Sequence, residues 1–272
     1  MITRRQTLKL GMQGVIGIAF AKSVIANELL VKQLPAELED WIDQLYFAAA
    51  KVRVGQIDAG AWQLEMDKLY RSVDINALMA RIDMNKLKNY IDCGDRIDCH
   101  GDQRVWFSKT PLRHNPENPI DSVVPLNVVT KFASVKKGYH IPPHGHTNMC
   151  SAFLLVSGRM HVRQYDRVGW DKGKKTLVIK KTVDAIQTRG QWTSISDYHN
   201  NCHWLKAESG DCYIFSTKLS GIQPETGKGG RLPFHYEAGN NLGSGLREVP
   251  LVSSQRSAEI YNQSLLGELM GE

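Results

Sequence analysis

The sequence predicts a mainly β protein with one barrel, a helical extension before it and a tail after it. Three observations support this fold class. Between about residues 105 and 221, short segments rich in β-branched and aromatic residues alternate with turns that contain Gly, Pro, Asn and Asp. From Pro35 to about Tyr90, apolar residues instead recur at three- and four-residue steps. No internal repeat divides the β region, so we expect a single barrel.

Residues 28–100 form the predicted helical extension. Asp58 and Asp74 stand where helix N-caps are expected. We expect Trp62 and Met66 to lie in the core, because two or three short helices need another surface to pack on and the barrel supplies one. The apolar residues that set the helical period at the start of this region are Leu38, Trp41, Ile42, Leu45, Tyr46 and Ala49.

Residues 222–272 form the predicted C-terminal tail. It begins with a Gly-rich loop and ends in a short helix. At 272 residues with 42% hydrophobic residues, the whole chain is long enough for one substantial core.

Residues 1–26 look like a targeting segment. Arg4 and Arg5 precede an apolar stretch, residues 10–21, that is too short for a comfortable membrane span. The segment resembles the twin-arginine export signal of bacteria, with cleavage expected after Ala21 or Ala26. That resemblance implies the twin-arginine export machinery as a partner, a periplasmic location and export in the folded state.

The formal charge of +6 has little to do with the predicted barrel. Arg4, Arg5, Lys9 and Lys22 supply four positive charges before the first acidic residue, Glu28, which leaves +2 for the rest. Elsewhere no cluster of Lys and Arg with interleaved aromatic residues stands out. We therefore expect no nucleic-acid partner.

The five cysteines, at positions 93, 99, 150, 202 and 212, contain no C-x-x-C pair. Cys93 and Cys99 flank a Gly-Asp turn and are candidates for a disulfide in an oxidising compartment.

His144 and His146 are the first candidate metal ligands. Residues two apart in a strand point to the same face, about 7 Å apart along the backbone, so both imidazoles can reach one ion. Pro142 and Pro143 remove two amide donors just before them, which favours the edge of a sheet or the start of a strand.

The segment around these histidines resembles the first motif of the cupin family, G-x5-H-x-H-x(3,4)-E-x6-G. Gly138, His144, His146 and Gly158 match it. The resemblance implies a cupin-type double-stranded β-helix, or jelly roll. The glutamate of the motif is absent, and its place falls to Cys150 or Ser151. Strand parity points Cys150 inward with the histidines, whereas the distance to Gly158 favours Ser151.

A third histidine ligand is expected from residues 196–221, where the second cupin motif is met only loosely. His203 begins a short strand and is our choice. His199 lies in a turn beside Asn200 and Asn201, where a solvated side chain is expected. We interpret the remaining histidines as structural: His100, His114, His140, His161 and His235.

Three neutral imidazoles leave open positions on a divalent metal ion. Iron(II) at such a site binds O2 and a substrate side by side, while zinc acts as a Lewis acid or a source of hydroxide. Three-His sites without the glutamate are similar to those of thiol dioxygenases and of some ring-cleaving dioxygenases. The resemblance therefore implies an iron(II) dioxygenase acting on a small molecule such as a thiol, with zinc, nickel, copper and manganese as alternative metals.

The thiol dioxygenases also suggest roles around the metal. Some of them link a cysteine to a tyrosine, which makes Cys150 with Tyr213 or Tyr165 candidates here. An arginine suits a substrate carboxylate because it binds it through two hydrogen bonds. The arginines available in the predicted barrel are Arg104, Arg159 and Arg163.

Two other classes of function fit the same residues. One is a non-catalytic periplasmic module that holds a metal or a ligand, which the missing glutamate favours. The other is a barrel that binds a sugar or another small molecule without metal. A homodimer through strand edges is a further expectation.

Overall fold

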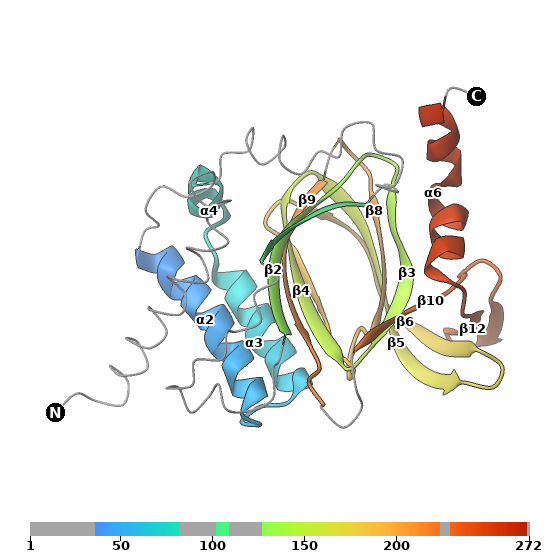
Figure 1. Cartoon of the computed structure of the whole chain (residues 1–272), viewed down its shortest axis with the longest axis horizontal. Coiled ribbons are helices and arrows are strands. Elements are labelled where there is room, and N and C mark those ends of the chain that lie inside the picture. Colours follow the sequence, from blue (N-terminus) through green and yellow to red (C-terminus); the bar gives the residue numbers. More distant parts are fainter. Residues whose placement is uncertain (1–35, 82–101, 109–126, 211, 224–228, 271–272) are drawn as a thin grey trace.

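Two antiparallel β-sheets face each other, with helices α2 and α3 beside one sheet and α6 beside the other (Figure 1). The computed structural model describes residues 36–81, 102–108, 127–210, 212–223 and 229–270. The predicted export signal, residues 1–26, and the predicted disulfide pair, Cys93 and Cys99, lie outside the described residues.

The first sheet has five strands in the order β1-β2-β9-β4-β7. Strand β9 lies between β2 and β4, and pairs with β2 over its whole length and with β4 from Tyr213 to Ser220. The bounds of these strands are β1 Asp102–Ser108, β2 Asn127–Val135, β9 Cys212–Ser220, β4 Met149–Ser157 and β7 Trp192–Ile195.

The second sheet has seven strands in the order β10-β3-β8-β5-β6-β12-β11. Its centre is the long hairpin of β5 and β6. The bounds of these strands are β10 Gly230–Pro233, β3 His140–Thr147, β8 Cys202–Ala207, β5 Arg159–Asp171, β6 Thr176–Thr188, β12 Leu246–Pro250 and β11 Asn240–Gly243.

The strand order itself identifies the fold. Strands β2 to β9 divide into two groups of four, β2-β9-β4-β7 in one sheet and β3-β8-β5-β6 in the other. An eight-stranded arrangement of this kind, in two antiparallel sheets, is a jelly roll. The prediction of a mainly β, cupin-type jelly-roll barrel with a helical extension and a tail is therefore confirmed.

The helical extension consists of α2 (Ala36–Arg53), α3 (Ala59–Ser72) and α4 (Ile75–Arg81). Both predicted N-caps are confirmed. The Asp58 carboxylate accepts a hydrogen bond from the backbone N–H of Ala61, and the Asp74 carboxylate accepts two from the first turn of α4. No helix in the described part of the chain is both long and apolar enough to cross a membrane.

Helices α2 and α3 pack on the outer face of the five-stranded sheet, as predicted. Trp62 and Met66 are fully buried in one cluster with Cys150 and Leu154 of β4. The Tyr70 hydroxyl also contacts the Thr217 hydroxyl of β9 at 3.0 Å. The even-numbered residues of β4 therefore face the helices, and its odd-numbered residues face the other sheet.

The tail contains more structure than the expected loop and short helix. Three short strands, β10 to β12, extend the seven-stranded sheet, and α6 (Ser254–Met270) follows them. All four residues of β11 are exposed, so its sequence has no alternation of apolar and polar residues to indicate a strand. Helix α6 is tied to β3, because the Asn262 side-chain oxygen accepts the His140 backbone N–H at 2.9 Å.

Candidate metal centre

Strand β3 carries His144 and His146 on its inner face. The pairing with β8 shifts between Ile141 and His144, so a bulge takes up the two prolines that cannot donate to a ladder. Strand β3 has neighbours on both sides, β10 and β8. Of the two expectations for these prolines, the sheet edge is therefore wrong. They are the third and fourth residues of β3, near its start, and the bulge is the reason that an interior strand tolerates them.

The structure brings His203 to the two histidines of β3. His203 lies directly opposite His144 in the pairing of β3 with β8, and opposite residues in neighbouring strands share a face. All three side chains are buried. Their Nε2 atoms converge: His203 is 3.0 Å from His144 and 3.4 Å from His146.

These distances fit one metal ion. Two nitrogens that bind an ion at about 2.1 Å lie about 3.0 Å apart at a right angle and about 3.4 Å apart at the tetrahedral angle. One ligand atom of each histidine lies within 4.8 Å of those of the other two, and no Asp, Glu or Cys among the described residues joins the group. The donor set is thus three imidazoles.

Neighbouring groups orient His144 and keep it in a form that is able to bind a metal ion. Its Nδ1 lies 2.7 Å from the Pro142 carbonyl oxygen, so Nδ1 donates and the Nε2 lone pair is directed to the other two histidines. Burial is the largest cause that lowers the pKa of His144 well below its usual value, followed by the charge of Arg231. Because the imidazole stays neutral, it is able to bind a cation.

The backbone between the ligands is held by side chains from two other segments. The His146 carbonyl accepts hydrogen bonds from Arg167 of β5 at 2.8 Å and from Asn201 at 3.2 Å. Asn201 directly precedes β8, so this amide ties the H-x-H strand to the segment that delivers His203.

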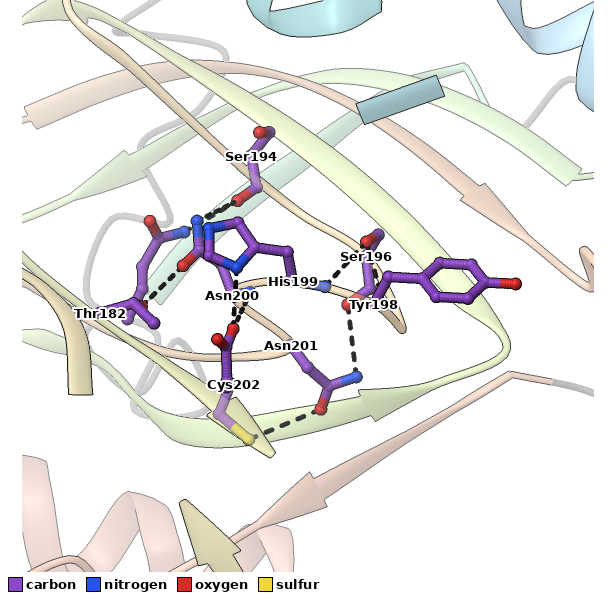
Figure 2. A network of polar contacts seen from close by, with 10 residues as sticks. Thr182, Ser194, Ser196, Tyr198, His199, Asn200, Asn201 and Cys202 are labelled. Atoms are coloured by element: carbon purple, nitrogen blue, oxygen red, sulfur yellow. Dashed lines mark hydrogen bonds and ion pairs between the residues drawn. The ribbon is translucent and has the colours of Figure 1, made fainter. Parts of the chain in front are cut away.

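That segment, residues 196–201, is itself fixed by a polar network (Figure 2). The Asn200 side-chain oxygen accepts the Thr182 hydroxyl at 2.6 Å, and the Asn201 amide lies 3.4 Å from the Ser196 carbonyl. A short segment whose polar side chains bond to its own backbone and to β6 holds the start of β8 in one place.

His199 does not join the centre. Its side chain is 57% exposed, and its Nδ1 lies 3.0 Å from the Asp166 carboxylate. Of the two candidates for third ligand, only His203 lies with His144 and His146.

Ser151, and not Cys150, faces the barrel interior. Cys150 is buried among the helices on the outer face of the sheet. The parity argument for Cys150 is wrong because Asn148 adopts a left-handed backbone conformation, with φ 53°, between β3 and β4, and this turn restarts the alternation. The position of the missing glutamate is therefore that of Ser151.

Neither tyrosine is placed to link to Cys150 at the centre. Tyr213 faces the helices as Cys150 does, but Cys150 is opposite Leu219, six residues further along β9. Tyr165 packs against Phe234, in a cluster separate from the one that contains Cys150. The proposed crosslink is thus contradicted for both tyrosines.

The predicted arginines do not line the centre. Arg163 stacks on Trp204, 4.2 Å from its ring centroid, beside α6. Arg159 is exposed at the start of β5, and the side chain of Arg104 lies outside the described residues. Sequence reasoning missed Arg231, which lies directly opposite His146 in the pairing of β10 with β3.

No family model and no curated protein matches this sequence. Solved structures give low-level matches with TM-scores of 0.28 to 0.30. Procruciferin, an 11S globulin from Brassica napus, has a TM-score of 0.28 and 14% identity over 39% of this chain and 22% of that chain. KdgF from a Halomonas species has a TM-score of 0.30 and 14% identity over 44% and 78%. Hazelnut (Corylus avellana) vicilin has a TM-score of 0.30 and 10% identity over 54% and 35%.

This chain thus spans about a fifth of procruciferin and about a third of the vicilin. The jelly-roll fold follows from the strand order of the two sheets. By fold and site, the protein is a cupin-type jelly roll with a buried three-His group that could hold a divalent metal ion.

Proposed function

We propose that this protein binds one divalent metal ion through His144, His146 and His203, and that it is an iron(II) dioxygenase of a small molecule such as a thiol. The observation that carries the proposal is the convergence of three buried Nε2 atoms at 3.0 and 3.4 Å. Such a donor set suits iron, zinc, copper and nickel, and three ligands leave at least one position on the ion open.

The chemistry that iron(II) supplies when bound is the activation of O2. With a thiol as substrate, the balanced reaction is RSH + O2 → RSO2H: sulfur loses four electrons, both oxygen atoms enter the sulfinic acid, and no further reductant is needed. The chain keeps the His144 imidazole neutral and restricts water. Phe153 supports the second role, because its ring packs 5.3 Å from that of His203.

We also propose that the protein is exported by the twin-arginine route and acts in the periplasm. The support is the resemblance of residues 1–26 to an export signal. Cell fractionation tests this location.

We further propose that the protein forms a homodimer. Gel filtration of the purified protein tests this oligomeric state.

The first experiment is elemental analysis of the protein purified without chelator, beside the His203→Ala variant. We expect about one iron per chain in the wild type and loss of that metal in His203→Ala, since two imidazoles hold an ion far less tightly than three. His199→Ala is the matched control: this histidine lies four residues away and outside the centre, so its loss should leave the metal content unchanged. Oxygen uptake with small thiols then tests the reaction.

Other outcomes change the conclusion in defined ways. If the wild type contains stoichiometric zinc, nickel or copper and shows no oxygen uptake, the metal site is confirmed but the dioxygenase activity is not. The protein would then be a metal-holding or ligand-binding module. Metal-free wild-type protein that takes up no iron(II) under anaerobic conditions would overturn the metal site itself.

A further inference from the structure

Asp67 of α3 is bonded to the strand that leads to the third ligand. Its Oδ1 accepts a hydrogen bond from the Ser194 hydroxyl at 2.7 Å and one from the Trp192 ring nitrogen at 3.2 Å. Trp192 and Ser194 are two apart in β7, so both side chains face the helix. The chain continues from β7 through residues 196–201 to His203, and the helical extension therefore contacts the segment that delivers this ligand.

Ser194 also bonds to the second sheet, through its backbone. Strand β7 lies at an edge of its sheet as far as the structure describes it, so one side of its backbone is open to side chains from elsewhere. The Ser194 carbonyl accepts the side-chain amide of Gln164, from β5, at 3.0 Å. The side-chain amide of Asn200 lies 3.5 Å from the same oxygen (Figure 2). Ser194 thus joins α3, β5 and the segment before β8.

Gln164 and Asn200 flank His203. Gln164 is directly opposite His203 in the pairing of β5 with β8, so the two share a face with Cβ atoms about 4.5–5.5 Å apart. Asn200 is three residues before His203, and its side-chain oxygen accepts the Thr182 hydroxyl at 2.6 Å. Gln164, Asn200 and Ser194 are all buried. Because a packed interior transmits strain, a shift of the Ser194 carbonyl moves the side chains beside the third ligand.

Helix α3 reaches the same segment at a second point. A β-carbon added to Gly60 would lie 3.4 Å from Cδ2 of Tyr198, so the tyrosine ring lies against the first turn of the helix. Tyr198 belongs to residues 196–201, and its side chain projects away from the polar network of that segment (Figure 2). The helix therefore contacts the chain at Trp192, Ser194 and Tyr198, all shortly before His203.

We infer that Asp67 is a positioning residue for the metal centre, and that it acts through Ser194 on the side chains that flank His203. A metal ion binds tightly only when its ligands are held in the right geometry, and loss of a group that orients a ligand typically weakens metal binding by about 10- to 100-fold. The inference rests on the proposed metal site. It gives the helical extension a role in that site, although all three ligands come from strands.

A purely structural role for α3 predicts something different. Tyr70 lies three residues after Asp67 in the same helix, and its hydroxyl contacts that of Thr217, in β9, at 3.0 Å. Strand β9 carries none of the three ligands. If α3 only stabilises the fold, loss of either contact should change stability alone. If Asp67 positions the centre, loss of its contact should also change the surroundings of His203.

Two kinds of spectrum test the inference. In the metal-free protein, the NMR signal of the carbon-bound ring hydrogens of His203 reports the surroundings of that ring. In the cobalt(II)-loaded protein, the visible absorption bands report the geometry around the ion, and chelator competition gives the affinity for cobalt. Asp67→Ala should shift or broaden the His203 signal, change the cobalt bands and weaken cobalt binding by about 10- to 100-fold.

Three further variants complete the test. Asp67→Asn keeps an oxygen that is able to accept both hydrogen bonds, so its spectra and cobalt affinity should be close to those of the wild type. Ser194→Ala removes one of the two bonds to Asp67 without changing the charge, and it should act in the same direction as Asp67→Ala even if that variant does not fold. Tyr70→Phe is the matched control, which should lower stability and leave both spectra and the cobalt affinity unchanged.

The inference is overturned if the substitutions of Asp67 and Ser194 by alanine leave the His203 signal and the cobalt bands as in the wild type, or if Tyr70→Phe changes them equally. A wild type that binds no cobalt overturns the proposed metal site instead. The His203 signal of the metal-free protein still decides, in that case, whether Asp67 positions the ring.

Discussion

Gly145 lies directly against Cys202, so that a β-carbon added to the glycine would be 2.9 Å from the cysteine sulfur. The two residues are opposite each other in the pairing of β3 with β8, on the outer face of the sheet. Close packing against Cys202, on the face of β3 away from the metal centre, therefore explains why the residue between His144 and His146 is a glycine.

The first prediction concerns that contact. Gly145→Ala should lower the free energy of unfolding by about 1–3 kcal/mol, because it overfills a packed position. It should also loosen the metal centre, because the strained residue lies between two ligands. Urea denaturation and chelator competition measure the two effects.

A second substitution at the contact provides the internal check. In Gly145→Ala/Cys202→Ala the sulfur is gone, so much of the lost stability should return, whereas additive losses would contradict the contact. Gly210→Ala is the neutral control, because a β-carbon there meets nothing within 4 Å.

The second prediction concerns Cys150 and Ser151, adjacent residues of β4 whose side chains face opposite sides of the sheet. Ser151→Glu places a carboxylate on the inner face and should raise metal affinity about tenfold or more by adding a fourth ligand, which chelator competition measures. Cys150→Glu places the same group among the apolar residues under the helices, where an unpaired carboxylate is costly to bury. That variant should be strongly destabilised without any gain in metal affinity, and the reverse pattern would show that the assignment of faces is wrong.

The third prediction is a pH dependence caused by His140 on the outer face of β3. Burial, the largest cause, lowers its pKa to about 4. The charges of Lys206, Arg163 and His161 lower the pKa further, and the charge of Glu208 raises it. Since the unfolded chain takes up a proton near pH 6.5 and the folded chain does not, stability should be complete above pH 6.5 and fall as the pH drops toward 4. The loss is at most about 3 kcal/mol, and less because the side chain is only partly buried.

The matched variant for this prediction is His140→Gln. Its side-chain oxygen is able to accept the hydrogen bond that Trp204 Nε1 now donates to His140 Nδ1 at 2.8 Å. Urea denaturation between pH 7 and 4.5 should give a smaller dependence on pH in the variant, and equal slopes would refute the assignment to His140.

The fourth prediction tests whether the helices form one folding unit with the barrel. Tyr70→Phe removes the buried hydroxyl pair between α3 and β9 and should cost about 1 kcal/mol in one cooperative unfolding transition. Adding Thr217→Val removes the other partner and should give a loss smaller than the sum of the two single changes. A separate early transition for the helices in the wild type would contradict a shared core.

Much of the fold was predictable because it follows from local patterns. Asp58 and Asp74 cap helices through bonds within four residues of themselves, and the core positions of Trp62 and Met66 follow from helical spacing. His144 and His146 share a face simply because they are two apart in one strand.

What could not be predicted depends on turns and on pairing between distant segments. The direction of Cys150 depends on the backbone of a single residue, Asn148, and no periodicity in the sequence reveals it. Arg231 was missed because its position follows from pairing with a residue 85 positions earlier, and the strand that carries it, β10, has only four residues.

The neighbours of β3 also determine when the metal centre is able to form during synthesis. One neighbour begins at Cys202 and the other ends at Pro233, and the Asn262 side chain that binds the start of β3 comes later still. A nascent chain that ends before His203 has two of the three ligands on an incomplete sheet. The centre is consequently among the last parts of the protein to be assembled, and a chain released too early exposes the backbone of its own ligand strand.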